Sequence, residues 1–346
     1  MMSEFYNEIC IRKEPYIIAE IGANHNGDIS LAKKMIDKAK ECGCDAVKFQ
    51  SWSKESLFAK NFYKEQNQFK DNNFGTLEEM VEKFSLSKKE HIVLKEYCDN
   101  KKITFCSTPT TLEEVDMLDE LKVPFFKVAS MDLNNLSFLK YVAEKGRTII
   151  LSTGMGSLAE IETALKTIYE TGNKEVILLH CIAIYPPDDK IINLRNIEML
   201  NKTFDIPVGF SDHTIGTPIP LAAITFGAKV IEKHFTLDKT MPGWDHAVSA
   251  NPEEMKIIVE EGRRIVTALG KYRRVVSEKE MKQRESFRRS IVTKREIKEG
   301  ELLKEEDLDF KRPGTGIGLD EIKYVLGRKV NKDIDEDELI KWEDLD

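Results

Sequence analysis

The sequence predicts an α/β fold, a (β/α)8 (TIM) barrel followed by a small second domain. Eight apolar runs rich in β-branched and aromatic residues recur through residues 1–270, as buried parallel strands do. Amphipathic helical patterns separate most of these runs, and this alternation is typical of a parallel barrel. The pattern changes near the end, where short segments with many turn residues follow one another. We therefore expect a barrel over residues 1–270, a linker over 271–286 and a small domain over 287–346.

The expected strands are the most regular feature of the chain. They cover residues 16–22, 46–50, 103–109, 125–130, 148–154, 175–181, 207–213 and 229–235. The interval between the second and third strands breaks the alternation. Its residues 54–84 form a long polar excursion, which we place over the mouth of the barrel.

Helix signals lie between the strands. Residues 30–42 repeat apolar side chains at helical spacing, and Gly43 follows as a terminator. Residues 252–270 have Pro in the first turn and Gly at the end, as helices often do. Capping-box pairs begin two further helices, after the third and fifth strands: Thr111 with Glu114, and Ser157 with Glu160.

Composition and charge narrow the classes of function. The chain is 41% hydrophobic and 32% charged, with a net charge of −8, which argues against a general nucleic-acid surface. Residues 1–15 lack the apolar core of a signal peptide, and no apolar run reaches the ~18 residues of a membrane span. We expect a cytoplasmic protein. The six cysteines include no C-x-x-C pair, so zinc ribbons and thioredoxin chemistry are not expected.

Polar side chains gather at the C-terminal ends of the expected strands, where a barrel of this kind has its active site. Lysines supply charge and hydroxyls supply donors, which together are the ingredients of a phosphate or carboxylate site. The segment from Gly154 to Gly156 leads into a capped helix and adds backbone N–H groups. The residues concerned are Lys48, Thr108, Lys127, Ser130, Ser152 and Ser211. By themselves they indicate a small phosphorylated anion.

Two of the expected strands each carry a histidine at the C-terminal end, and these residues are His213 and His234. Because side chains alternate along a strand, Glu232 shares a face with His234, and Lys233 lies on the other face. We expect the neighbouring strands to bring the two imidazoles together. Two imidazoles with open positions suit a divalent ion such as manganese, cobalt or zinc. Candidates for orienting a metal-bound water or a substrate hydroxyl are Glu20 and Asp245.

An ordered set of motifs resembles the sialic acid synthase family. The motifs are AEIGANHNGD (19–28), VKFQ (47–50), STP (107–109), FKVAS (126–130), LSTGM (151–155), FSDHT (210–214), EKHFT (232–236) and DHAVS (245–249). The tail resembles the family's C-terminal antifreeze-like (SAF) domain, in FRRSIV (287–292), KRPGTGIG (311–318) and LGRKV (326–330). The resemblance covers essentially the whole chain.

The resemblance implies an enzyme that condenses phosphoenolpyruvate with an N-acetylmannosamine-like aldose and releases phosphate by C–O cleavage. It implies a divalent metal, usually Mn²⁺, on His213 and His234, acting as a Lewis acid on the aldehyde oxygen. Phosphoenolpyruvate would be held by Lys48, Thr108, Lys127, Ser130, Ser152 and Ser211. The catalytic residues, which would act on the water and on the sugar hydroxyls, would be Glu20, Glu232 and Asp245. The sugar contacts would be Asp132, Tyr185 and Arg312.

The resemblance also implies a domain-swapped homodimer, in which the small domain caps the partner's barrel. Arg312, in the motif KRPGTGIG, would then reach the acetamido group of the sugar. Nucleic acid and membrane partners are not expected. The same swap would help to keep so small a module folded.

The chain departs from the family pattern at positions that would face the sugar. In HCIAIYPP, Ile182 and Ala183 replace a pair that is commonly polar, while Trp244 and Ala247 flank the motif's Asp245 and His246. A less polar wall suits a 6-deoxy, diacetamido sugar, as in legionaminate or pseudaminate synthesis, so the acceptor stays open. Two alternatives also stay open. One is a synthase using a phosphorylated aldose, which would have no SAF-type tail, and the other is a non-catalytic sugar- or phosphate-binding barrel.

Overall fold

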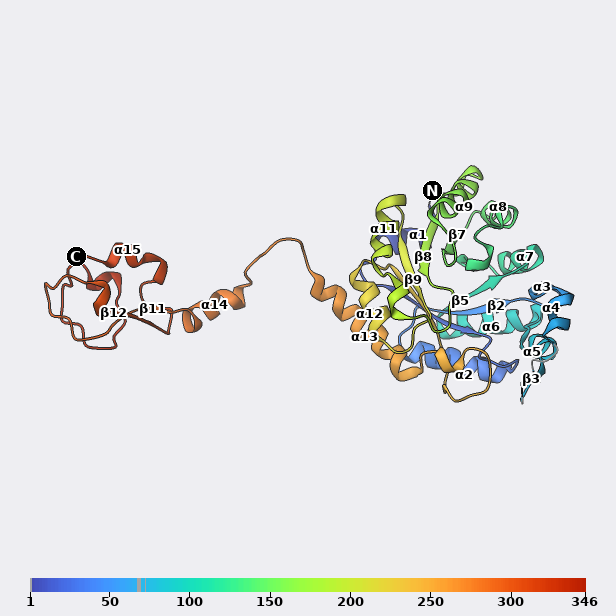
Figure 1. Ribbon diagram of the computed structural model, residues 1–346, viewed down its shortest axis with the longest axis horizontal. Coiled ribbons are helices and arrows are strands. Elements are labelled where there is room, and N and C mark those ends of the chain that lie inside the picture. The colour runs from blue at the N-terminus through green and yellow to red at the C-terminus, as the bar shows by residue number, and fades with distance from the viewer. Residues whose placement is uncertain (1, 67–69, 72) are drawn as a thin grey trace. The chain divides into compact units, whose positions relative to one another are not determined.

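The computed structural model describes residues 2–66, 70–71 and 73–346. It divides into two compact units, residues 1–270 and 271–346. The first unit is a barrel of parallel strands surrounded by helices (Figure 1). In the part of the chain that the structure describes, no helix combines the length and the apolar character that crossing a membrane requires.

All eight expected strands form, and they make one sheet. The strands are β1 (Tyr16–Gly22), β2 (Ala46–Ser51), β5 (Thr104–Pro109), β6 (Phe125–Val128), β7 (Thr148–Ser152), β8 (Val176–Cys181), β9 (Val208–Asp212) and β10 (Val230–His234). Their order is β5-β2-β1-β10-β9-β8-β7-β6, and every ladder between them is parallel. The end strands β5 and β6 contact each other. The sheet is thus a nearly closed barrel, and the predicted fold class is confirmed.

Helices cover the outside of the barrel, and the two predicted from spacing are α2 and α13. The helices of this layer are α2 (Ile29–Glu41), α6 (Lys88–Lys101), α7 (Leu112–Glu120), α8 (Leu136–Glu144), α9 (Leu158–Glu170), α10 (Asp189–Ile192), α11 (Arg195–Phe204), α12 (Pro218–Thr225) and α13 (Pro252–Leu269). The predicted capping boxes of α7 and α9 are both present. Short 3₁₀ turns follow two of the strands, η1 (Ser130–Asp132) and η2 (His246–Val248).

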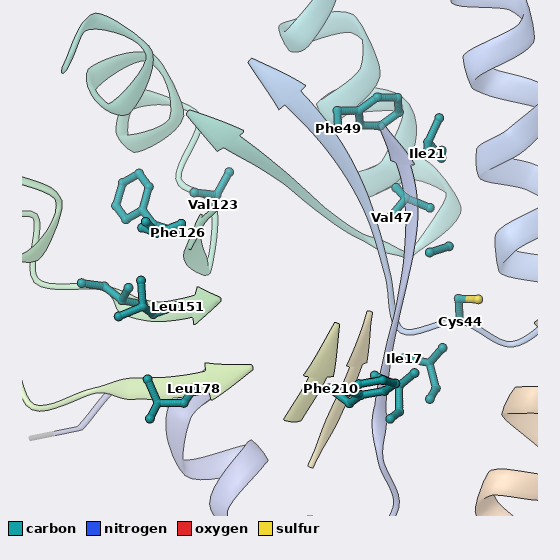
Figure 2. Packing of buried hydrophobic residues seen from close by; sticks show 14 of the residues in the cluster. Ile17, Ile21, Cys44, Val47, Phe49, Val123, Phe126, Leu151, Leu178 and Phe210 are labelled. Atoms are coloured by element: carbon teal, nitrogen blue, oxygen red, sulfur yellow. The ribbon is translucent and has the colours of Figure 1, made fainter. Parts of the chain in front are cut away.

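Side chains that point outward from the strands form the main hydrophobic core against these helices. Figure 2 shows Val47 and Phe49 of β2 near Ile21 of β1, and Ile17 of β1 near Phe210 of β9, all of them buried in this layer. Inside the barrel, apolar residues fill only the N-terminal half. There they pack against α1 (Glu4–Ile11), whose Phe5 ring stacks on Phe125 with 4.5 Å between ring centroids. The C-terminal half of the interior is left for polar side chains.

The segment between β2 and α6 carries its own apolar cluster. It contains α3 (Lys54–Leu57), α4 (Lys60–Glu65), β3 (Lys70–Asp71), β4 (Gly75–Thr76) and α5 (Leu77–Phe84); residues 67–69 and 72 of the predicted excursion lie outside the described residues. Trp52, Tyr63, Met80, Val81 and Phe84 are buried together. The description of this excursion as polar is therefore incomplete, because its charged residues accompany an amphipathic helix.

The second unit is a small module with a separate core. Its elements are α14 (Glu278–Phe287), β11 (Ser290–Thr293), η3 (Glu305–Asp307), β12 (Leu308–Lys311), η4 (Leu319–Glu321), α15 (Ile322–Val325) and η5 (Trp342–Asp344). β11 and β12 are antiparallel, and Ile291, Leu303, Leu308, Val325 and Ile340 are buried among its core residues. Helix α14, which begins within the predicted linker, buries none of its residues.

Candidate active site

A cavity of about 260 Å³ opens at the C-terminal ends of the barrel strands. The strands supply its polar lining by alternation, because the residue two positions beyond a buried apolar one points to the same side. Lys48 thus follows Ala46 on β2, and Glu232 follows Val230 on β10. The predicted site residues that line the cavity are Glu20, Lys48, Thr108, Lys127, Ser130, Ser152, Tyr185, Ser211, His213, Glu232 and His234.

Two buried lysines lie in the cavity, each hydrogen-bonded to a hydroxyl of the next strand. Lys48 Nζ donates to Thr108 Oγ1 at 2.8 Å, and Lys127 Nζ donates to Ser152 Oγ at 2.7 Å. Both lysine residues are about 3% exposed, so their ammonium groups are shielded from water and interact strongly with any anion that enters. Burial lowers the pKa of Lys127, although the Glu232 carboxylate opposes that effect.

Two carboxyl groups share the cavity with the lysines, and their environments differ. Glu20 Oε2 lies 2.9 Å from Lys48 Nζ, whereas Glu232 lies 3.7 Å from Lys127 and 3.9 Å from Lys48. Burial, together with the charge of Glu232, raises the pKa of Glu20 to about 7 against the lowering effect of Lys48. Burial also acts to raise the pKa of Glu232, but the two lysines together with the Ser211 hydroxyl hold it below its usual value. Near neutral pH the pair therefore combines one readily protonated carboxyl with one carboxylate.

The two histidines face each other, as predicted, with 5.6 Å between ring centroids. Burial lowers the pKa of His213 to about 4 and that of His234 to about 3, so both rings are neutral. His213 Nδ1 lies 2.8 Å from the Ile182 carbonyl, to which it donates, leaving Nε2 as the free acceptor. The Tyr185 ring packs on His213 at 3.9 Å between centroids. These features fix one imidazole in the orientation of a metal ligand.

His234 completes a donor set that fits a divalent cation. Its Nδ1 atom is buried without a hydrogen-bond partner in the described part of the chain, and Asp245 Oδ2 lies 3.6 Å from it. Neutral nitrogen donors with a nearby carboxylate suit a borderline or hard divalent ion. Within residues 2–66, 70–71 and 73–346, no three His, Cys, Asp or Glu side chains gather into a metal site. The protein thus offers two imidazoles and leaves the remaining positions to water or substrate.

Three predicted site residues do not line the cavity. Asp245 has its Oδ2 atom 3.6 Å from His234 Nδ1. Asp132 is buried, its Oδ1 accepts from Asn135 Nδ2 at 3.1 Å, and burial raises the pKa of its carboxyl. Arg312 belongs to the second unit, where its guanidinium lies 5.1 Å from the Phe287 ring centroid.

Lys233 takes the opposite face from Glu232 and His234, as the strand alternation predicts. Its ammonium group is buried outside the cavity, where it donates to Asp212 Oδ2 and to the Thr214 carbonyl, each at 2.6 Å. This ion pair joins the ends of β9 and β10, the strands that carry the two histidines.

Gln50 and Trp52 are among the lining residues that were missed from the sequence. Gln50 Nε2 donates to Glu20 Oε1 at 2.8 Å, and Trp52 is buried at the cavity wall. The signal was present, because the alternation that turns Lys48 inward also turns residues 50 and 52 inward. Among the positions that depart from the family pattern, Ala183 lines the cavity. Trp244 packs on Trp52 instead, with 6.0 Å between ring centroids.

Known proteins resemble this chain over nearly its whole length. The NeuB family model matches residues 35–274, and the SAF domain model matches residues 288–346. The chain is 42% identical to the N,N'-diacetyllegionaminic acid synthase of Campylobacter jejuni, over 95% of this chain and 99% of that protein. It is 37% identical to the human N-acetylneuraminate-9-phosphate synthase, over 96% and 92% of the two chains. The solved N-acetylneuraminic acid synthetase of Leptospira borgpetersenii superposes with a TM-score of 0.70 and 37% identity, covering 78% of this chain and 90% of that one.

Proposed function

Because this chain belongs to the NeuB family and carries a SAF domain, we propose that it is a nonulosonic acid synthase. It condenses phosphoenolpyruvate with an N-acetylated aldose. C3 of phosphoenolpyruvate forms a C–C bond to the aldehyde carbon, water adds at C2, and the C–O bond to phosphate breaks. The observation that carries the proposal is one cavity in which lysine–hydroxyl pairs lie beside two facing, neutral imidazoles.

The lysine–hydroxyl pairs are the proposed site of phosphoenolpyruvate. Lys48 with Thr108 and Lys127 with Ser152 offer charge and donors from adjacent strands. Two further hydroxyls line the same cavity, and both already contact neighbours. Ser130 Oγ accepts from the Gly154 N–H at 3.0 Å, and Ser211 Oγ donates to Glu232 Oε1 at 3.0 Å.

Charge balance supports a bound cation. Phosphoenolpyruvate carries roughly 2.5 to 3 negative charges at neutral pH, from a carboxylate and a phosphate monoester. The two lysines and Glu232 supply a net charge of about +1 when Glu20 is protonated. A divalent ion, which we expect to be Mn²⁺, would be held by His213 and His234. When bound, it supplies Lewis acidity to the aldehyde oxygen of the open-chain sugar.

The two carboxyl groups are proposed to divide the proton chemistry. Glu20 exchanges a proton near neutral pH because its pKa is about 7. In its ionised form it would accept a proton from the water that adds at C2 and pass it to the oxygen that was the aldehyde oxygen. Glu232 remains ionised and keeps both lysine side chains directed into the cavity. Asp245, whose carboxylate lies 3.6 Å from His234, is proposed to orient a water or a sugar hydroxyl on that side.

Phosphate release tests the function directly. The protein is incubated with phosphoenolpyruvate, Mn²⁺ and either N-acetylmannosamine or a 2,4-diacetamido-2,4,6-trideoxyhexose. We expect phosphate to appear only when an aldose is present. The second sugar is included because Ala183 makes the wall less polar and because a relative 42% identical is a diacetyllegionaminic acid synthase. No release with any aldose at saturating metal would favour the non-catalytic, ligand-binding alternative.

The metal assignment has its own test in His213→Ala and His234→Ala. Each variant should keep the wild-type circular dichroism spectrum and lose at least ~1,000-fold in kcat, since polarisation of the aldehyde is worth several kcal/mol. Mn²⁺ binding is measured separately by electron paramagnetic resonance, and both variants should bind far more weakly. His180→Ala is the matched control, because His180 bonds to the Ile192 carbonyl at 2.6 Å and is not among the cavity-lining residues. Wild-type Mn²⁺ affinity in either test variant would refute the assignment.

A further inference from the structure

A chain of buried polar side chains crosses the core layer outside β2 and β5. Ser51 Oγ lies 2.8 Å from His91 Nε2 and 2.7 Å from Ser107 Oγ, and each of the three residues is 1% exposed. The layer around them is largely apolar, and Phe105 packs edge-on against the His91 ring with 6.4 Å between ring centroids. Polar groups in such a layer are costly unless each is paired. This chain therefore calls for a reason beyond the filling of space.

The chain has one consistent set of donors and acceptors. His91 Nδ1 lies 3.0 Å from the Ser87 carbonyl oxygen, which can only accept, so Nδ1 carries the ring proton. Burial lowers the pKa of His91 and keeps the ring neutral, so Nε2 is an acceptor. Ser51 therefore donates to His91, and Ser107 donates to Ser51. His91 is the terminal acceptor that orients both hydroxyl groups.

Each serine of this chain stands next to a residue that lines the cavity. Ser51 follows Gln50 on β2, and Ser107 precedes Thr108 on β5. Because side chains alternate along a strand, the two serines point outward while Gln50 and Thr108 point into the barrel. The strands pair in register at this level, with Gln50 opposite Thr108. The bond between the serines thus joins β2 to β5 on the face of the sheet opposite the cavity.

On the cavity face, the same two strands carry one of the lysine–hydroxyl pairs. Lys48 of β2 donates to Thr108 Oγ1 of β5 at 2.8 Å. A small displacement of β5 against β2 would change the separation of the ammonium group and the hydroxyl, and with it the geometry offered to an anion. The other pair, Lys127 with Ser152, belongs to β6 and β7. The polar chain therefore acts on one of the two pairs.

We propose that His91 is a positioning residue for the phosphoenolpyruvate site. Through Ser51 and Ser107 it holds the ends of β2 and β5 in the arrangement that keeps Lys48 beside Thr108. Helix α6 carries His91 but contributes none of its described residues to the cavity lining. This inference rests on the proposed function, since it concerns the binding of phosphoenolpyruvate at that same site.

The test compares His91→Leu with His91→Gln. Leucine leaves the Ser51 hydroxyl without its acceptor, whereas glutamine can place Oε1 near the position of Nε2. The Ser87 carbonyl keeps a partner in both variants, because it also accepts from the backbone N–H of residue 91 at 3.0 Å. By calorimetry without aldose, His91→Leu should raise the Kd of phosphoenolpyruvate about five- to tenfold, the effect of one hydrogen bond. His91→Gln should stay within about twofold of wild type.

Turnover and a matched control distinguish positioning from a general loss of stability. In His91→Leu the KM of phosphoenolpyruvate should rise by the same factor, while kcat and the KM of the aldose change less than about twofold. His180→Leu also removes a buried imidazole from the outer layer, but its hydrogen bond is made to the Ile192 carbonyl. Both leucine variants should unfold at lower urea concentration. Only His91→Leu should weaken the binding of phosphoenolpyruvate.

A double variant tests whether the effect passes through the serines. Ser51→Ala breaks the chain between His91 and Ser107 and should raise the Kd of phosphoenolpyruvate by a similar factor. If the two residues act through one chain, His91→Leu/Ser51→Ala should bind no more weakly than either single variant. Effects that multiply would contradict the chain. If His91→Leu does not fold, Ser51→Ala and Ser107→Ala test the same proposal, and both should raise this Kd.

The possible failures are distinguishable. Wild-type affinity for phosphoenolpyruvate in His91→Leu, an equal loss in His91→Gln, or an equal loss in His180→Leu would each reject the positioning role and leave the proposed function intact. If the wild-type protein itself binds no phosphoenolpyruvate, the proposed function fails, and the positioning role fails with it.

Discussion

At Glu20, burial and a neighbouring ammonium group have opposite effects on the pKa of one carboxyl group. Its side chain is fully enclosed beside Lys48, yet its pKa is raised to about 7 because loss of solvent outweighs the ion pair. A carboxyl group in that state exchanges a proton near neutral pH, which suits the proposed addition of water. The same shift has a consequence for folding that needs no substrate.

The stability of the metal-free protein should depend on pH through Glu20. Between its ordinary pKa of 4.5 and its folded value of about 7, the folded state holds a proton that the unfolded state has lost. The free energy of unfolding therefore falls as pH rises through this window. Glu20→Gln has no such proton to release, so its free energy of unfolding should rise relative to that of wild type between pH 5 and 7.5. The relative rise across this range should be on the order of 2–3 kcal/mol.

Thermal unfolding of both proteins across this pH range measures the effect. Glu160→Gln is the control, because Glu160 is an exposed capping carboxylate whose pKa is lowered by hydrogen bonds to Ser157. Its difference from wild type should stay constant above pH 5. Parallel curves for Glu20→Gln and wild type would show that the Glu20 pKa is not raised.

At the scale of the element, the ends of β9 and β10 are joined by one buried ion pair. Asp212 and Lys233 are essentially inaccessible to solvent, with side chains 0% and 1% exposed. They flank His213 and His234 in sequence but lie on the opposite face of the sheet. A buried pair of this kind adds little net stability when compared with apolar residues. Removal of one partner, however, leaves the other charge buried without a counter-charge.

Lys233→Met should therefore destabilise the protein by about 3–5 kcal/mol. The double variant Asp212→Leu/Lys233→Met should recover most of that loss, since no charge remains buried. Urea unfolding of Lys233→Met, Asp212→Leu and the double variant gives the coupling free energy. Lys202→Met removes an exposed pair with Glu198 and should change stability by less than ~1 kcal/mol. If Lys233→Met were no more destabilised than Lys202→Met, the expected loss of stability from an unpaired buried charge would be contradicted.

The barrel and most of the cavity could be predicted because their signals are local. Each strand is a continuous apolar run, and alternation alone turns Lys48, Glu232 and His234 inward. Helix α1 was not predicted, and the bounds of α6 were not predicted either. Helix α6 buries only His91, Leu94 and Cys98 among many charged residues, so its apolar stripe is narrow.

Contacts between segments that are far apart in the chain could not be predicted from the sequence. Trp52 and Trp244 are separated by most of the barrel sequence, and their packing depends on the paths of two loops. Only the structure shows that the indole Nε1 of Trp52 is buried without a hydrogen-bond partner among the described residues. Likewise, the sequence brought His213 and His234 to one region, but only the structure shows which ring atoms stay free.

At the scale of the whole molecule, the predicted sugar contact Arg312 and the cavity belong to different units. Arg312 has no ion-pair partner within the described residues, and it is held beside Phe287. An arginine free of carboxylates is available to a ligand or to another chain. We expect Arg312 to act in trans, from one copy of the chain to the barrel of another, as in a domain-swapped homodimer.

Subunit complementation tests this expectation. His213→Ala disables the barrel of one copy, and Arg312→Ala weakens sugar binding by the SAF domain of the other. Arg312→Ala alone should raise the KM of the sugar much more than that of phosphoenolpyruvate, so assays use a low sugar concentration. In co-expressed mixtures, an exchanged domain pairs an intact barrel with an intact Arg312 in one site of each mixed dimer. Activity should then return to about a quarter of wild type, since half of the dimers are mixed.

The alternative, in which each SAF domain serves its own barrel, predicts a different outcome from the same mixture. Every site would then carry one defect, and activity would not exceed that of Arg312→Ala diluted by half. Co-expression of His213→Ala with the double variant His213→Ala/Arg312→Ala is the control, because it contains no intact barrel in either arrangement. Recovery in the test mixture but not in the control requires that one chain completes the site of another. A mixture no more active than diluted Arg312→Ala would place the arginine in cis or outside the site.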